Sequence, residues 1–406
     1  MWKVKVVYFS VFILSIFVDL YNGYVQLIRH DSTAIGAVFK LCVLAFCLYY
    51  SLSKLRILKF FLLFTFLYFL SASYWMFNGY VSNYTDFLST LTRTLYPYAI
   101  LGFFLANRKK VSANTLSNWI LLYSVICSVS MHICNYLGYY KMRDYGYGAH
   151  GLFIAGNDLS VSLIIGVCLA SYLFTLKSTW KNFLIILIIS SALMTIGTSA
   201  GIIAVVLNFI FIMVQPMFVK QKVNRFYRRF RIIILVSCLP MCYFSVDRIM
   251  NYDDYARNKY QISRLASGGA RDVLENAFDK VSKDFKYTDY VFGIGTEELY
   301  NRIGKSMSLY EERGVELDQY DILGAFGLLL GSLLMAVPLI YLKRFVFYFK
   351  NKRTSFGFWG SIATGMFVIH GFVAGHAFTS IQALTIMLLL FYIYKFKEDL
   401  NSISNS

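Results

Sequence analysis

The sequence predicts an all-α protein, a polytopic transmembrane helical bundle with about 12 spans and one long extracytoplasmic loop that carries amphipathic helices. Apolar residues make up 58% of the 406 residues, and charged residues make up 15%. The mean hydropathy is +0.56. Soluble domains hold about 25% charged residues, so this composition excludes a soluble protein and places most of the chain in a bilayer.

The predicted spans are apolar runs, most of them long enough to cross the hydrocarbon core of a bilayer at roughly 17 to 25 residues. They cover Val4–Tyr21, Ala34–Leu52, Ile57–Met76, Phe87–Leu105, Ser117–Leu137, Asp158–Leu176, Phe183–Ile196, Ser199–Phe218, Ile232–Phe244, Asp321–Leu342, Phe358–Ala374 and Phe378–Tyr394. The seventh and ninth runs are shorter than the others.

Lys and Arg are concentrated in every second connection, for example at Lys3 and Lys5, at Arg108–Lys110 and at Lys343–Arg353. Cytoplasmic loops hold the excess of these residues, so the alternation predicts that both termini are cytoplasmic. Most of the formal net charge of +17 is therefore explained by the Lys and Arg residues of cytoplasmic connections. No nucleic-acid partner is expected.

The seven cysteines lie in apolar runs without the spacing of a metal site or a disulfide framework. They are Cys42, Cys47, Cys127, Cys134, Cys168, Cys238 and Cys242. We expect neither a metal nor another cofactor.

The chain divides into a first part of the bundle at residues 1–246, a loop at 247–320, and a second part of the bundle with a short tail at 321–406. Apolar residues recur in the loop at steps of three and four, which predicts an amphipathic helix. They are Ala270, Leu274, Ala277, Phe278, Val281 and Phe285. A weaker pattern at Thr296, Leu299, Ile303 and Met307 predicts a second such helix. Such a helix lies on the membrane or covers a cavity, so the loop is expected to be a folded lid.

Charged residues within spans require a partner or a wet cavity. Lys40 and Arg93 each lie about 9 Å below the outer surface at helical rise. One interpretation pairs Asp19 with either cation. The other assigns Arg93 to a phosphate, because the guanidinium fork suits that group.

Three acidic residues, Glu316, Asp318 and Asp321, precede the tenth span. They are interpreted either as caps of the helix N-terminus or as chemical groups of a site. The sixth span starts with Asn157 and Asp158, and runs inward from the same face. Its free N–H groups favour an anionic ligand there.

Several segments together resemble the bacterial O-antigen ligase and polymerase superfamily, closest to the O-antigen or capsule repeat-unit polymerases. The segments are Arg143 with Gly151–Asn157, Thr195–Gly201, Ser267–Arg271, Gly293–Gly295, and the Glu316, Asp318 and Asp321 set followed by Gly327. The resemblance covers most of the chain. Two departures are that ligases of the family have a histidine in place of Glu316, and that the family's Ser-Arg pair is Ser199-Ala200 here.

The resemblance implies a glycosyltransferase that acts on polyprenyl-diphosphate-linked oligosaccharides at the outer face of the bacterial plasma membrane, without a metal. Glu316 is then the candidate general base, with Asp318 as the alternate. Arg143, Arg264, Arg271 and Arg93 are the candidates for binding the substrate diphosphate. Asn157 and Asp321 are expected to bind substrate. A further protein that regulates chain length is the expected partner besides the lipid bilayer.

Two other functions stay open, a ligase-type glycan transferase and a flippase or transporter for lipid-linked oligosaccharides. A carrier of two six-span halves has its long linker in the middle on the cytoplasmic side. Here the connection between spans six and seven is short, at Lys177–Asn182. The position of the long loop therefore argues against a carrier.

Overall fold

The computed structural model describes residues 2–31, 33–81, 84–140, 148–219, 232, 236, 270–307 and 317–403. These residues form a helical bundle, and no strand occurs among them. Its first part contains α1 (Trp2–Phe9), a π-helical turn (Ser10–Leu14), α2 (Ser15–Ile28), α3 (Ile35–Ser51), α4 (Leu55–Phe77), α5 (Tyr84–Ala106), α6 (Ala113–Tyr136), α7 (Gly156–Leu176), α8 (Trp180–Ile196) and α9 (Ser199–Phe218). The rest contains α13 (Ala270–Ser282), α14 (Tyr287–Phe292), α15 (Thr296–Ser306), α16 (Asp318–Lys352), α17 (Ser355–Val373) and α18 (Ile381–Ile403).

Seven of the described helical segments are long and apolar enough to cross a membrane. They are Trp2–Ile28, α4, α6, α7, α9, α16 and α17. The other predicted runs coincide with the apolar helices α3, α5, α8 and α18, apart from Ile232–Phe244, most of which lies outside the described residues. The chain is therefore a helical membrane protein, and the count of about 12 spans stays a prediction.

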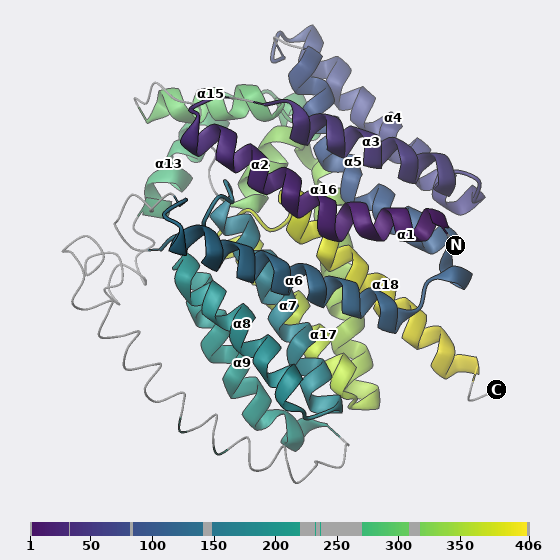
Figure 1. The fold of residues 1–406 in the computed structure, drawn as a ribbon. Helices are drawn as coiled ribbons and strands as arrows, with labels where there is room; N and C mark the ends of the chain where they lie inside the picture. Colours follow the sequence, from purple (N-terminus) through teal and green to yellow (C-terminus); the bar gives the residue numbers. More distant parts are fainter. Residues whose placement is uncertain are drawn as a thin grey trace.

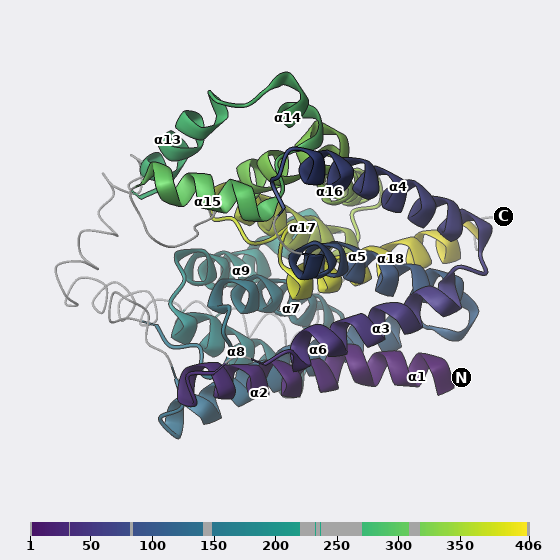
Figure 2. The same cartoon turned by 90° about the horizontal axis from the view of Figure 1, so that it is seen from above.

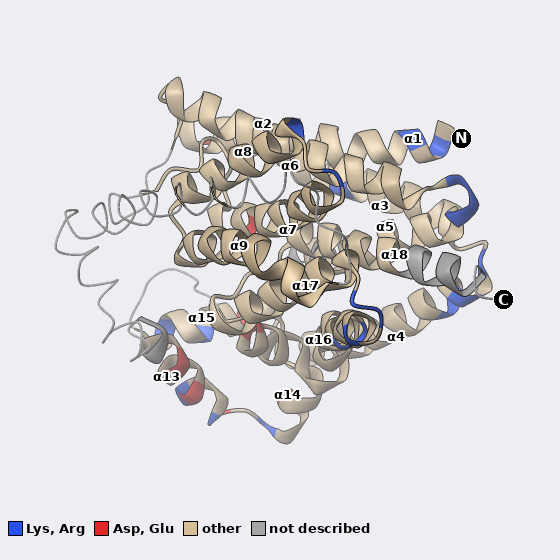
Figure 3. Cartoon of the chain, turned by 90° about the horizontal axis from the view of Figure 1, so that it is seen from below, with Lys and Arg blue, Asp and Glu red and all other residues tan. Residues whose placement is uncertain are grey.

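The centre of the bundle is α7, most of whose residues are buried. It packs against α8, α17 and α18, and α18 packs in turn against α5. The start of α1 and the end of α18 lie at the same end of the bundle (Figure 1). Figure 3 shows many of the Lys and Arg residues toward this end, whereas α13 carries Asp and Glu.

Helices α13, α14 and α15 form a layer, here called the loop layer, beside α16 and α4 (Figure 2). Both amphipathic helices predicted in the loop are present as α13 and α15. Leu274 and Ala277 of α13 are buried, as are Leu299 and Ile303 of α15. Spacing by three and four placed these side chains on one face, and that face packs against the rest of the protein.

Candidate functional site at the start of α16

Asp318, the first residue of α16, has a fully buried carboxylate that holds the connection between α17 and α18. Its Oδ1 accepts hydrogen bonds from the His376 backbone N–H at 2.8 Å and the Thr379 hydroxyl at 3.0 Å. Its Oδ2 accepts from the backbone N–H groups of Ala377 at 2.7 Å and Phe378 at 2.6 Å. A buried carboxylate needs such donors to offset its desolvation. Asp318 therefore anchors a loop that lies about 60 positions later in the chain.

The connection that Asp318 holds turns sharply at Gly375 and His376, whose φ angles are +70° and +63°. Ser380 ends it and caps α18, since its Oγ accepts from the Ala383 N–H at 3.2 Å. Gln319, next to Asp318, adds a bond from its side-chain amide to the Phe372 carbonyl at 3.2 Å. The start of α16 and the start of α18 are thereby held together.

The first turn of α7 reaches the same place. The Asp158 carboxylate hydrogen-bonds the Ser380 side chain and interacts electrostatically with His376, Asp318 and Lys40. Asn157 precedes it at the half-buried start of α7. The N-termini of α7, α16 and α18 thus meet around two carboxylates, one imidazole and one ammonium group.

The start of α9 is linked to the first part of α7 by a hydrogen bond between two hydroxyl groups. Thr198 caps α9 by accepting from the Gly201 N–H at 2.9 Å, and its hydroxyl lies 2.7 Å from that of Ser160. Thr198 is therefore the N-cap of α9.

Helix α16 is interrupted at Gly327, whose φ of +66° and ψ of −175° are not helical. The segment Gly293–Gly295 pairs with α16 just before this break. Ile294 N–H donates to the Gly324 carbonyl at 3.0 Å, and Gly295 N–H donates to the Ala325 carbonyl at 2.9 Å. Two motifs of the resemblance, about 30 positions apart in the chain, are therefore in direct backbone contact. Irregular backbone of this kind is stable in a membrane protein only where other protein groups satisfy it.

Gly327 has no room for a side chain. A Cβ built there lies 2.4 Å from the Gly293 nitrogen and 2.4 Å from the Val291 carbonyl oxygen, and this region of φ and ψ is open essentially only to glycine. Gly327→Ala should lower the free energy of unfolding by about 3 kcal/mol or more. The measurement is thermal unfolding in detergent micelles.

Gly365→Ala is the matched control, because a Cβ on this α17 residue meets only Leu342 at 3.9 Å. Its stability should equal or exceed that of the wild type, since alanine is the better helix former. Equal unfolding temperatures for the two variants would contradict the arrangement at Gly327.

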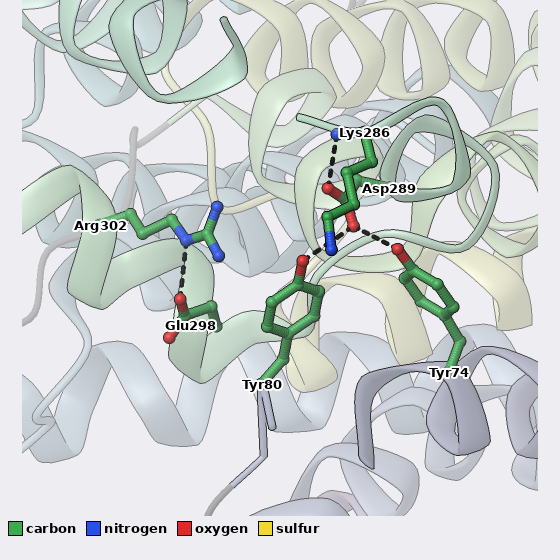
Figure 4. Close-up of polar contacts among 6 residues, drawn as sticks. All are labelled: Tyr74, Tyr80, Lys286, Asp289, Glu298 and Arg302. Carbon is green, nitrogen blue, oxygen red and sulfur yellow. Dashed lines mark hydrogen bonds and ion pairs between the residues drawn. The ribbon is translucent and has the colours of Figure 1, made fainter. Parts of the chain in front are cut away.

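A buried acidic residue, Asp289, fastens the loop layer to α4 and the segment after it (Figure 4). Its Oδ1 accepts from the hydroxyls of Tyr74 at 2.6 Å and Tyr80 at 3.2 Å, and its Oδ2 accepts from the Lys286 N–H at 2.7 Å. Trp75 follows Tyr74 in α4, and its indole N–H donates to the Phe292 and Gly293 carbonyls. These bonds hold the segment that pairs with α16.

Arg302 of α15 lies beside this contact. It pairs with Glu298 at 2.7 Å and lies 5.1 Å from the centre of the Tyr80 ring. Partial burial acts to lower the pKa of Arg302, but the Glu298 carboxylate and the Tyr80 hydroxyl together outweigh this effect and raise the pKa. Burial and the Asp289 carboxylate raise the pKa of Tyr80, so its hydroxyl remains a donor at neutral pH.

The structure brings together two of the residues that the sequence singled out, Asp318 and the start of α7 at Asn157. Asp321 lies one turn after Asp318 and is buried. Because α16 begins at Asp318, three residues before the predicted span, Asp321 is not at the cap position. Arg93 is exposed on α5, and Arg271 lies in the first turn of α13. Glu316, Arg143 and Arg264 lie outside the described residues.

Of the two cations considered for Asp19, Lys40 lies near its carboxylate and interacts with it electrostatically, but no direct ion pair of Asp19 with Lys40 or Arg93 occurs among the described side chains. The Asp19 carboxylate instead accepts from the Gln382 amide, whose oxygen accepts from the Tyr123 hydroxyl. Lys40 lines the same small cavity and acts on Asp19 through its charge. This polar contact joins α2, α6 and α18 inside the bundle.

Sequence reasoning missed His376, Tyr74, Tyr80 and Asp289. Only His376 had a local signal, because Gly375-His376 forms a short polar turn between two apolar runs.

No protein-family model matches the chain, and no curated protein matches it. The fold and the site together define a helical membrane protein with a polar cluster where several helix N-termini meet.

Proposed function

We propose that this protein is a polymerase that joins polyprenyl-diphosphate-linked oligosaccharide repeat units into a surface polysaccharide at the outer face of the bacterial plasma membrane. The observation that carries the proposal is that separate segments of the resemblance meet around the first part of α16. Gly293–Gly295 pairs with the residues before Gly327, and the start of α7 lies near Asp318.

The proposed reaction forms one glycosidic bond and breaks one bond to phosphate. A hydroxyl oxygen of the acceptor unit attacks the anomeric carbon of the donor glycan, and the bond from that carbon to the diphosphate oxygen breaks. The hydroxyl proton passes to a carboxylate, and the polyprenyl diphosphate leaves with its charge stabilised by cations. Arg143, Arg264, Arg271 and Arg93 are the proposed cations.

Within this proposal, Glu316 is the general base and Asp318 has a different role. Both Asp318 oxygens already accept two hydrogen bonds each. These four bonds and the complete burial of Asp318 leave no carboxylate oxygen open to a hydroxyl group of the substrate. Asp318 is thus a positioning residue for the connection that carries His376, and the proton is assigned to Glu316.

The test is deletion of the gene in its host, followed by gel analysis of the surface polysaccharide. A polymerase deletion should leave a single displayed repeat unit and no long chains. Loss of all display would overturn the proposal and favour a flippase or a ligase. Complementation with the intact gene should restore the original chain lengths, which controls for effects on neighbouring genes.

A further inference from the structure

The backbone of His376 adopts a conformation that is costly for any residue with a side chain. Its φ is +63°, in the left-handed region, where glycine has no steric penalty. Asp318 maintains this conformation through the bond to the His376 N–H. Glycine at this position would form the same turn at lower cost, so the turn alone does not account for the imidazole. Strained backbone of this kind is concentrated at functional sites.

The imidazole has charged and polar neighbours from two other elements. Asp158 of α7 and Asp318 of α16 both interact with His376 electrostatically. Asp158 also hydrogen-bonds Ser380, and Lys40 of α3 acts on Asp158 from the bundle side. Asp158 and His376 are both only half-buried, in contrast to Asp318. These two residues therefore keep part of their surface exposed, whereas the anchoring residue Asp318 does not.

We propose that His376 and Asp158 form a subsite that binds hydroxyl groups of a sugar in the lipid-linked substrate, which rests on the proposed function. A carboxylate accepts hydrogen bonds from hydroxyls, and the ring nitrogens of an imidazole also hydrogen-bond hydroxyls. The two carboxylates around His376 disfavour a phosphate at this place. The proposed ligand of this subsite is thus a sugar hydroxyl group, and not the diphosphate assigned to the arginines.

His376→Gly tests the subsite, because glycine keeps the turn and removes the imidazole. The substrate is lipid-linked repeat units extracted from a host strain that lacks this gene, and the readout is the rate of joining by purified protein at increasing concentration. Loss of a hydrogen bond from a charged cluster should raise the half-saturating concentration roughly tenfold to a hundredfold. The maximal rate should change little, since the contact is made equally in the ground and transition states. Thermal stability in detergent should equal or exceed that of the wild type.

Asp158→Asn should raise the half-saturating concentration in the same way. His132→Gln is the matched control, because His132 of α6 is bonded to Ser191 of α8 and lies outside this cluster. It should behave as the wild type. If His376→Gly folds poorly, His376→Asn replaces it, since asparagine also adopts positive φ.

Wild-type half-saturation in the His376 variants would overturn the subsite and leave the proposed function standing. A lower maximal rate at unchanged half-saturation would also overturn it. Failure of the wild-type protein to join repeat units would overturn the proposed function and the subsite together.

Discussion

Asp318→Ala should destabilise the protein by about 3 kcal/mol or more, because it leaves three backbone N–H groups, two of them buried, without their acceptor, at roughly 1 to 3 kcal/mol for each buried group. The groups belong to His376, Ala377 and Phe378. Removing the carboxylate also removes the free-energy cost of burying that group, which offsets part of the lost stability. The measurement is thermal unfolding in detergent micelles, together with proteolysis of the connection between α17 and α18.

Two further variants calibrate the effect of Asp318→Ala. Thr379→Val removes only the hydroxyl bond to Oδ1 and should cost about 1 kcal/mol. Asp279→Ala removes an exposed carboxylate on α13 and should stay within about 0.5 kcal/mol of the wild type. If Asp318→Ala unfolds at the same temperature as Asp279→Ala, Asp318 is not an anchor.

Asp318→Ala should also impair the proposed reaction, although Asp318 does not handle the proton there. The released connection no longer fixes His376 in its strained conformation. We therefore expect weaker substrate binding as well as lower stability. Helix α17 lies close to the Asp318 carboxylate at Gly371, because a Cβ on Gly371 would lie 2.9 Å from Asp318 Oδ2.

Patterns within a short stretch of sequence predicted much of the fold. Apolar runs such as Asp158–Leu176 became helices because a helix is the only single segment that satisfies its own backbone groups in a bilayer. The steps of three and four at Leu274 and Ala277, and at Leu299 and Ile303, correctly predicted α13 and α15. These signals are local, so no knowledge of the folded protein is needed to read them.

The contacts that build the candidate site join residues far apart in the chain. The periodicity of apolar residues along the sequence does not predict such contacts. From its position before a span, Asp318 was interpreted as a helix cap or as the alternate general base. Its actual partners lie 58 to 61 residues away. Likewise, Gly293 and Gly327 each appeared as a separate motif, and only folding shows that their backbones touch. The hydrogen bond from Gln382 to Asp19 was missed for the same reason, since these two residues are remote in sequence.

Glu316→Gln should lower the rate of polymerisation roughly 10² to 10⁴-fold, the usual cost of losing a positioned general base. The change keeps the size of the side chain and most of its hydrogen bonding, but glutamine does not accept the proton of the acceptor hydroxyl. Glu316 lies outside the described residues, two positions before the anchored Asp318. The variant should therefore insert normally, bind lipid-linked repeat units and leave them unpolymerised.

The Glu316 prediction is checked on surface-polysaccharide gels at matched expression, with Asp279→Asn as a control that should keep wild-type chain lengths. The half-saturating concentration should stay near the wild-type value, in contrast to His376→Gly, because the base acts in the transition state. Wild-type chain lengths from Glu316→Gln would remove Glu316 from the reaction. Since Asp318 is saturated with hydrogen bonds, an oxygen of the substrate diphosphate would then be the remaining proton acceptor.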